Sequence, residues 1–290
     1  MRLALAAIAL LLLCAGAQGA GGQVPAFDRV IVVVLENKER GDVLGNGHAP
    51  AFNAFARHGA VVTRYRGVTH PSLPNYLALV SGSTHGIRDD CTRCTVAGPS
   101  LADTFEARKL TWKAYAEGLP RPGWTGPARG RYAKKHVPFL YFRRVLASPR
   151  RLRRVVPLRQ LGLDLDAGRL PDFSLVVPDL CHDMHDCSVA TGDAWLKGFL
   201  PPLLQLPRTA VFVVFDESDG PDPGVAALAL GTIVRPGSRY TDATSHYGLL
   251  RTIEDGFGLR HLGRSARAAP ITGIWRRPGP PPKEGYAARP

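Results

Sequence analysis

Outside its first twenty residues, the 290-residue sequence has no long hydrophobic run. A membrane-spanning helix needs about 20 consecutive apolar residues, so no span is expected after residue 20. Residues 1–20, MRLALAAIALLLLCAGAQGA, contain one early arginine, an apolar run and a small-residue end. This pattern is typical of a cleaved secretory signal peptide. We therefore expect a secreted or periplasmic protein.

Cysteine is scarce, with five residues in the chain, and Cys14 belongs to the predicted signal peptide. The other four form two close pairs, Cys91 with Cys94 and Cys181 with Cys187. In an oxidising compartment such pairs favour two local disulfides. The alternative is a zinc site built from CxxC knuckles, but the second pair is spaced too widely for a knuckle.

Acidic residues are outnumbered, 24 against 37 basic ones, which gives a formal charge of +13. Much of the excess lies between Arg143 and Arg159. A basic patch attracts phosphates, nucleic acid or anionic lipid surfaces, but a solvated basic surface explains the same composition equally well. The charge is compatible with an anionic substrate and indicates nothing more specific. No internal repeat is present, so a repeat architecture is not expected.

Strand-like and helix-like patterns alternate along the chain. Buried strands are expected at 27–37, 172–180, 209–218 and, more weakly, 224–234. Helical patterns lie at 49–59, 72–82, 100–110, 192–206 and 245–259. The alternation predicts an α/β fold, with a mostly parallel central sheet flanked by helices on both faces. One domain is expected over 21–275, followed by a disordered tail at 276–290, which lacks a core-forming pattern.

Acidic residues follow three of these strands: Glu36 with Asn37, Asp179, and Asp216 with Glu217. Ligands of open α/β sheets bind beyond the carboxyl ends of the strands. Each acid alone is explained by a helix cap, a turn or an ion pair. Their repetition at the same topological position predicts one site at that edge.

Carboxylates and histidines together are the ligands of divalent cations. The densest stretch is DLCHDMHDC, bounded by the predicted Cys181–Cys187 disulfide; a surface loop whose histidines cap helices is the alternative. The candidate metal ligands are Glu36, Asp179, His182, Asp183, His185, Asp216, Glu217 and His246. We expect a divalent metal ion, whose identity and number the sequence does not define.

Ser72 lies in HPSLPN, at the predicted start of a helix. A serine hydroxyl is a weak nucleophile unless a base or a metal activates it, and the predicted metal site supplies that activation. A helix start also presents backbone N–H groups and a positive dipole end to an anion. Asn37 and Asn75 carry amides that can donate to phosphoryl oxygens. The alternative is an ordinary capped helix start with an early proline.

Eight segments in order between about residues 28 and 260 resemble the bacterial phosphoesterase family of acid phosphatases and phospholipases C, in the alkaline-phosphatase-like superfamily. They are VVVLENKERGDVLG, HPSLPNYLALVSGSTHGIRDDC, TWKAYAEGLP, KKHVPFLYF, PDLCHDMHDC, TGDAWL, VFVVFDESDG and SHYGLLRTIEDGFGL. Some small secreted members are phosphatidylinositol-3-phosphatases. The resemblance implies an alkaline-phosphatase-like fold and hydrolysis of phosphate esters.

The resemblance also implies roles for individual residues. Ser72 matches the nucleophile position, and His136 matches a histidine that contacts the phosphate or protonates the leaving group. The implied substrate-binding residues are Asn37, Asn75 and Asp90. Asp179 and His182 depart from the asparagines usual in relatives. The resemblance therefore favours a metal-ligand set of Glu36, Asp183, His185, Asp216, Glu217 and His246.

These observations predict an exported, metal-dependent phosphomonoesterase that acts through a phosphoserine intermediate on a phosphate monoester, with a phosphoinositide headgroup as one option. A phosphodiesterase or phospholipase C using the same site is the first alternative. A non-catalytic secreted module that binds anionic lipid or nucleic acid is the second. No specific nucleic-acid partner is expected, whereas peripheral membrane contact is compatible with the basic segment.

Overall fold

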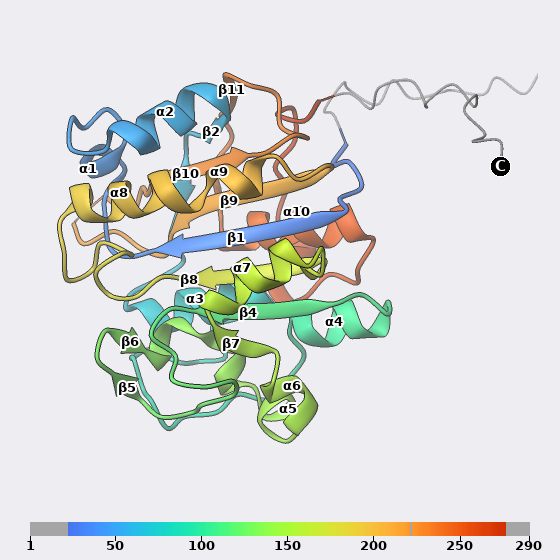
Figure 1. Cartoon of the computed structure of the whole chain (residues 1–290). Coiled ribbons are helices and arrows are strands. Elements are labelled where there is room, and N and C mark those ends of the chain that lie inside the picture. Colours follow the sequence, from blue (N-terminus) through green and yellow to red (C-terminus); the bar gives the residue numbers. More distant parts are fainter. Residues whose placement is uncertain (1–22, 221, 277–290) are drawn as a thin grey trace, which may run out of the picture.

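The computed structural model describes residues 23–220 and 222–276 (Figure 1). The predicted signal peptide and the tail from residue 277 lie outside the described residues. An eight-stranded sheet runs through the molecule. Its strands in spatial order are β11 (Ser238–Tyr240), β2 (Ala60–Val62), β10 (Ala227–Leu230), β9 (Thr209–Phe215), β1 (Arg29–Leu35), β8 (Phe173–Val177), β4 (Trp112–Ala116) and β7 (Val155–Pro157).

The sheet is mostly parallel, as expected. Only β10, among the described strands of this sheet, runs antiparallel to its neighbours β9 and β2. Two small two-stranded sheets pair β12 (Thr244–Ser245) with β3 (Tyr65–Arg66) and β5 (Ala128–Arg129) with β6 (Tyr132–Ala133). The α/β fold predicted from the alternating patterns is confirmed.

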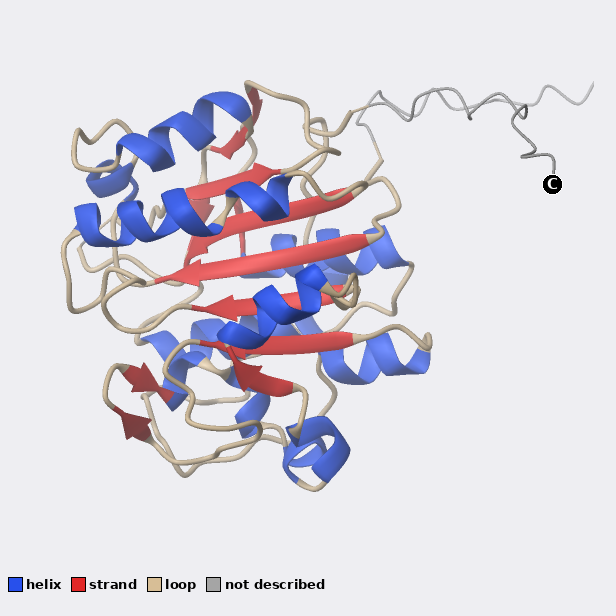
Figure 2. Cartoon of the chain, viewed as in Figure 1, coloured by secondary structure: helices blue, strands red, loops and turns tan. Residues whose placement is uncertain are grey.

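Helices cover both faces of the large sheet (Figure 2). In Figure 1, α7, α8 and α9 lie in front of it, and α3 and α10 lie behind. The α-helices are α1 (Arg40–Val43), α2 (Pro50–His58), α3 (Ser72–Ser81), α4 (Leu101–Ala107), α5 (Arg143–Leu146), α6 (Pro149–Leu152), α7 (Arg159–Asp166), α8 (Val189–Phe199), α9 (Pro201–Leu204) and α10 (His246–Phe257). The 3-10 helices are η1 (Lys134–His136), η2 (Pro138–Tyr141) and η3 (Gly263–Arg267).

All five predicted helical segments are helical, with one correction. The segment 192–206 is divided into α8 and α9, because Pro201 and Pro202 cannot continue the hydrogen-bond ladder of α8. No described helix combines the length and apolar character that crossing a membrane requires.

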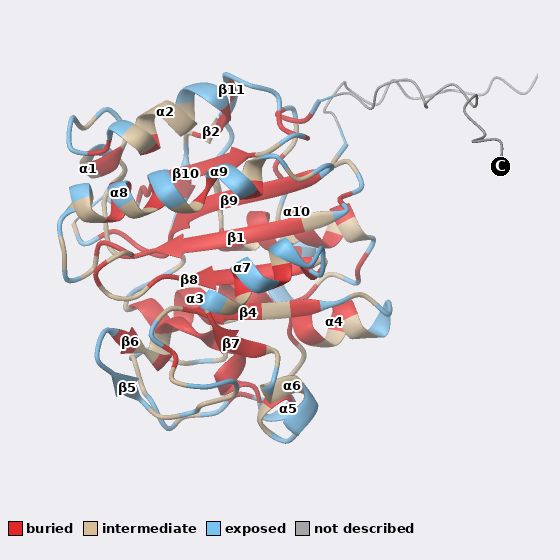
Figure 3. Ribbon diagram, viewed as in Figure 1, coloured by how far each residue is buried: buried red, intermediate tan, exposed pale blue. Residues whose placement is uncertain are grey.

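The core lies where the central strands are covered on both faces (Figure 3). Residues Val30 to Leu35 of β1 are all buried, which explains why this strand reads as a continuous apolar run rather than an alternating one. β1 is flanked by β8 and β9, so the residues that follow these three strands meet at one edge. That edge carries the candidate site.

Glu254 on α10 is a buried acid away from this edge. It accepts hydrogen bonds from the backbone N–H of Leu262 (2.8 Å) and the hydroxyl of Ser265 (2.5 Å). Burial raises its pKa to about 7. Because the folded pKa exceeds the unfolded one, Glu254 contributes stability below about pH 4.5, and that stability is lost as the pH rises through 7.

Replacing Glu254 with glutamine should therefore increase the free energy of unfolding relative to wild type, by a difference that grows between pH 4.5 and 7. The shift sets an upper limit of about 3 kcal/mol. Chemical denaturation of both proteins at several pH values measures this difference. A difference that does not change with pH would show that Glu254 titrates normally.

Candidate active site

Four buried carboxylates surround the start of α3. Glu36 follows β1, Asp216 and Glu217 follow β9, and Asp183 lies on the loop after β8. Leu35 pairs with Phe215 in the sheet, which brings Glu36 and Asp216 to the same level, and the backbone N–H of Glu36 donates to the carbonyl of Asp183 (2.8 Å). The predicted convergence of acidic strand ends is present, but its third acid is Asp183 and not Asp179.

Ser72 lies between two of these acids. Its hydroxyl oxygen is 2.9 Å from Oε2 of Glu36 and 3.1 Å from Oε1 of Glu217. One hydroxyl has one proton, so it can donate to only one of the two carboxylates. The second close contact requires a further proton or a cation. Ser72 is 1% exposed, so water cannot supply that proton or charge, and leaving the carboxylate uncompensated would be costly.

His136 is the cation that the chain itself places in this cluster. Its Nε2 is 3.2 Å from Oε2 of Glu36, and its Nδ1 is 3.5 Å from Oδ2 of Asp183. Burial would lower the pKa of His136, but these two carboxylates raise it to about 9. In return, although burial would raise the pKa of Glu36, the charge and hydrogen bond of His136 lower it to about 2, with help from Tyr76 and Lys135.

The pKa values of Asp183 and Asp216 are raised rather than lowered. Burial raises the pKa of Asp183 to about 6, against the opposing hydrogen bond from His136. Burial and the charges of Glu36 and Glu217 raise the pKa of Asp216 well above its usual value. Oδ2 of Asp216 is buried without a hydrogen-bond donor, whereas Oδ2 of Asp183 and Oε2 of Glu217 each face only a histidine nitrogen. Four buried carboxylates with an unpaired oxygen among them fit a hard divalent cation.

His70 and Tyr76 also belong to the cluster, and the sequence analysis missed both. Nδ1 of His70 is 2.5 Å from Oε2 of Glu217, and its side chain is more than half exposed. The hydroxyl of Tyr76 donates to Oε1 of Glu36 (2.5 Å), and its ring stacks on His136 with centroids 5.2 Å apart. Tyr76 is four residues after Ser72, a spacing that places both on one helix face and was a usable signal.

His246 does not face the carboxylates. Its Nε2 donates to the backbone carbonyl of Asp216 (2.6 Å), and the hydroxyl of Tyr65 donates to its Nδ1 (2.8 Å). Burial lowers its pKa to about 4, consistent with a neutral ring. Both ring nitrogens thus have protein partners, so in this arrangement His246 fixes the backbone that carries Asp216. Its predicted ligand role is not seen in the geometry.

The other predicted residues are distributed around the site. His185 lies beside it, with its ring centroid 6.1 Å from that of His136, but its Nδ1 is 2.7 Å from Oδ1 of Asp186. The backbone N–H of Asn37 donates to Oδ1 of Asp216 (3.3 Å), and its side-chain Oδ1 is buried without a donor. Asn37 is thus close to the carboxylates and retains an unpaired amide oxygen.

Asp90 and Asn75 are occupied by the protein. Asp90 accepts from the backbone N–H of Leu73 (2.9 Å) and pairs with Lys135 (3.1 Å), a cation that the sequence analysis missed. Because Asp90 takes the N–H of Leu73 and Pro74 has none, the start of α3 offers an anion fewer backbone donors than we expected. Asp90 positions Lys135 and α3, so the geometry does not support its predicted contact with substrate.

Asn75 holds the loop before Ser72. Its Oδ1 accepts from the N–H groups of Val68 (2.7 Å) and Thr69 (3.1 Å). Its Nδ2 donates to the carbonyls of Thr69 (2.6 Å) and Pro71 (3.2 Å). All the side-chain polar atoms of Asn75 are engaged, so its predicted substrate contact is absent from this arrangement.

Replacing Asn75 with alanine should destabilise the fold by about 2–4 kcal/mol, because four backbone groups lose their partner. Phosphate-ester hydrolysis should fall as well, since this loop sets the position of Ser72. Guanidinium unfolding and steady-state assays measure both effects. Unchanged stability with reduced activity would instead support the predicted substrate contact.

A second group of ligand-type side chains lies on the other side of the Cys181–Cys187 loop. Glu117, Asp179 and His182 are the only three such residues, within 23–220 and 222–276, whose ligand atoms all lie within 4.8 Å of one another. Nδ1 of His182 is 2.9 Å from Oε2 of Glu117, so these groups already pair among themselves. The cluster around Ser72 has four buried carboxylates and an unpaired oxygen on Asp216, so it is the better candidate for a cation.

Both predicted disulfides are confirmed. Cys91 pairs with Cys94, with Cα atoms 5.7 Å apart, and Cys181 pairs with Cys187, with Cα atoms 4.7 Å apart. The second bond closes the loop that carries Asp183. A cross-link this close to Asp183 limits the freedom of the loop in both folded and unfolded chains.

Comparisons with known proteins agree with this architecture. The phosphoesterase family matches residues 39–260. A phosphatidylinositol-3-phosphatase from Mycobacterium tuberculosis is 38% identical over 88% of this chain and 85% of its own length. A phosphate-repressible acid phosphatase from Penicillium chrysogenum is 30% identical over 82% of this chain and 61% of its own length. This chain thus spans about three fifths of that fungal relative.

Solved structures support the fold. A protein of the alkaline phosphatase superfamily from Vibrio parahaemolyticus aligns with a TM-score of 0.60 and 12% identity, over 83% of this chain and 69% of that chain. A phosphonate monoester hydrolase of Agrobacterium radiobacter aligns with a TM-score of 0.54 and 14% identity, over 84% and 76%. The fold is therefore that of the alkaline phosphatase superfamily. Together with the family match and the phosphatase relatives, it establishes that this chain belongs to the phosphoesterase family and is a hydrolase of phosphoric ester bonds.

Proposed function

We propose that the protein is an exported, metal-dependent phosphomonoesterase that acts through a phosphoserine at Ser72. The observation that carries the proposal is the Ser72 hydroxyl, buried and within 3.1 Å of two carboxylates, in a cluster of four buried carboxylates that includes the unpaired Oδ2 of Asp216. Export is supported by the two disulfides, which persist in oxidising compartments.

Glu36, Asp183, Asp216 and Glu217 are the residues that would hold the cation. A bound divalent cation would lower the pKa of the Ser72 hydroxyl and neutralise phosphoryl oxygens. His185 lies beside this set, and its ring would have to leave Asp186 to join it. His246 contributes by holding the backbone of Asp216, rather than by direct binding.

In the proposed reaction, the Ser72 oxygen attacks phosphorus and the ester oxygen leaves on the opposite side. The proton of the hydroxyl passes to Glu217, which contacts it and whose pKa is raised by burial. Water then hydrolyses the phosphoserine and releases inorganic phosphate, which restores the hydroxyl. Splitting the displacement into two steps in this way is characteristic of a nucleophilic enzyme.

Lys135 and His70 are proposed to bind the oxygens of the phosphoryl group, while Ser72 attacks phosphorus. Lys135 is held by Asp90, next to α3, and the charges of Glu36 and Asp90 raise its pKa against the effect of burial. His70 contacts Glu217 and is exposed on its outer side. His136 is 1% exposed and is bound to Glu36 and Asp183, so we assign it to positioning Glu36 rather than to protonating the leaving group.

The test compares p-nitrophenyl phosphate with bis(p-nitrophenyl) phosphate. The proposal predicts a higher kcat/KM for the monoester, as the names of the acid phosphatase relatives suggest. A faster diester reaction would favour the phosphodiesterase or phospholipase C alternative. Phosphate release from phosphatidylinositol 3-phosphate, beside the 4-phosphate and 5-phosphate isomers, examines the substrate suggested by the mycobacterial relative.

A further inference from the structure

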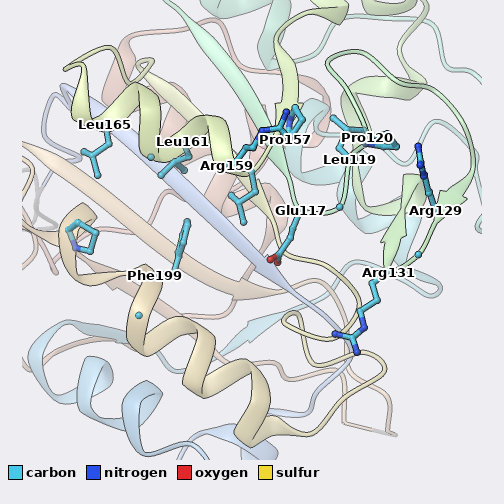
Figure 4. Close-up of a pocket in the computed structure, with 16 residues that line it drawn as sticks. Glu117, Leu119, Pro120, Arg129, Arg131, Pro157, Arg159, Leu161, Leu165 and Phe199 are labelled. Carbon is cyan, nitrogen blue, oxygen red and sulfur yellow. The ribbon is translucent and has the colours of Figure 1, made fainter.

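A groove lies on the face of the sheet covered by α7, α8 and α9, separate from the Ser72 cluster (Figure 4). Its volume is about 1040 Å³, and no residue of the cluster lines it. The Cys181–Cys187 loop separates the two: Asp183 contacts His136 in the cluster, whereas His182 contacts Glu117 in the wall of the groove. The groove is therefore a second concave surface, of the size that holds small molecules.

The two ends of the groove differ in chemistry. Leu161, Leu165 and Phe199 gather at one end, and Arg129 and Arg131 lie toward the other (Figure 4). Arg159 projects between them. The groove is thus amphiphilic, with an apolar part and a cationic part.

The arginines of the groove differ from three neighbouring arginines in their pairing. Arg144, Arg150 and Arg151 are paired with Asp103 or Glu106. By contrast, the guanidinium groups of Arg129, Arg131 and Arg159 make no ion pair with a carboxylate of the described residues. A guanidinium presents several donors suited to a carboxylate or phosphate. These three side chains therefore remain available to an anion.

Glu117 lies at the same end, but its carboxylate is engaged by the Cys181–Cys187 loop rather than by an arginine. Its Oε2 is 2.9 Å from Nδ1 of His182 and accepts from the backbone N–H of Asp179 at 3.1 Å. The carboxylate is thus already held by the Cys181–Cys187 loop. The carbonyl of Arg131 accepts from the N–H of Leu180 (3.0 Å), which ties the cationic end to the same loop.

Two glycines keep the groove open. Gly162 on α7 and Gly198 on α8 both line it, and a Cβ built on either would meet no atom within 4 Å. Neither has a left-handed backbone that would call for glycine. Glycine inside a helix is less stable than alanine, so neither position needs glycine for its backbone or for close packing. The space that they leave lies beside the apolar wall.

We propose that this groove binds one acyl chain of a single-chain anionic lipid. The hydrocarbon lies along Leu161, Leu165 and Phe199, and the anionic group meets the three arginines. Burying the chain supplies affinity in proportion to its length, and the guanidinium groups select the anion. The proposal does not depend on catalysis at Ser72.

Calorimetric titration of the mature protein with dodecanoate, below its micellar concentration, tests the proposal. Dodecanoate should bind with one-to-one stoichiometry. Because each buried methylene strengthens binding by up to about fourfold, octanoate should bind at least tenfold more weakly. Uncharged monolauroylglycerol should also bind more weakly, and inorganic phosphate should not displace dodecanoate. Equal binding of octanoate and dodecanoate would overturn the proposal.

Substitutions locate the site. Gly162→Phe and Gly198→Phe fill the groove from facing helices, and each should weaken dodecanoate binding at least tenfold while leaving p-nitrophenyl phosphate hydrolysis unchanged. Gly47→Phe is the matched control, because a Cβ there also meets no atom within 4 Å and Gly47 lies outside the groove. Binding unaffected by both groove variants would place the lipid elsewhere and contradict the proposal.

Two further variants test whether a loss of dodecanoate binding comes from misfolding or from the catalytic site. Arg131→Gln changes an exposed side chain, so it should fold normally and still bind dodecanoate more weakly; wild-type affinity in this variant would remove the proposed anion contact. Ser72→Ala should bind dodecanoate as wild type does. Loss of hydrolysis in Ser72→Ala with intact binding supports both proposals, whereas loss of dodecanoate binding would place the lipid in the catalytic site.

Discussion

Replacing Ser72 with alanine is expected to reduce hydrolysis of p-nitrophenyl phosphate by at least about a thousandfold, as loss of a nucleophile does in other hydrolases. The physical reason is that Ser72 is the one hydroxyl that contacts both Glu36 and Glu217 among the described residues. The loss should appear in kcat more than in KM, because the side chain acts in the transition state.

The same helix provides a matched control for Ser72→Ala. Ser81, at the other end of α3, is also buried, and its hydroxyl donates to the carbonyl of Leu77 (2.7 Å). Ser81→Ala should keep activity within about twofold, since it removes a hydroxyl outside the carboxylate cluster and costs only about 1 kcal/mol of stability. Equal activity of both variants and wild type would show that Ser72 is not the nucleophile.

Removing divalent cations with a chelator is expected to abolish hydrolysis and to lower thermal stability. The four carboxylates around Ser72 are buried, and without a cation their mutual repulsion opposes folding, as the raised pKa values of Asp183 and Asp216 indicate. Restoring a cation at one hundred times its Kd should stabilise the protein by about 2.7 kcal/mol. Differential scanning calorimetry of the stripped protein, titrated with metal, measures this effect without an activity assay.

Two variants assign the cation to one of the two ligand groups. Asp216→Asn should reduce the stabilisation by metal, because it removes one charge from the cluster around Ser72. Glu117→Gln should leave it unchanged, because Glu117 belongs to the separate group with Asp179 and His182. The reverse result would move the metal to that second group. Full activity and an unchanged melting temperature in excess chelator would contradict metal dependence.

The central strands were predictable because burial on both faces makes them continuous apolar runs. β4 and β7 were not predicted as strands: β4 includes Lys113, and β7 is only three residues long. The antiparallel direction of β10 was also not predictable, because a buried strand has the same composition in either direction. The order and direction of the strands depend on pairing between segments that are far apart in the sequence.

At the site, the positions of Glu36, Asp216 and Glu217 followed from strand ends, whereas Asp183 lies on the loop after β8. The orientations of side chains did not follow. Asn75 and Asp90 were expected at the substrate, but backbone groups near Ser72 lack partners within the helix or sheet, and these two side chains supply them. His246 was expected at the metal, but it supports the backbone of Asp216. The amino-acid sequence alone does not distinguish a residue that contacts the metal or substrate from a residue that supports such a contact.

The central claim, a phosphoserine at Ser72, is tested most directly by trapping the intermediate. The protein is mixed with a large excess of p-nitrophenyl phosphate, quenched in acid within milliseconds and digested, and its peptides are analysed by mass spectrometry. The account predicts one phosphate on the peptide that contains Ser72, absent from Ser72→Ala and from chelator-treated protein. A phosphate on a different residue, with Ser72 unmodified, would contradict it.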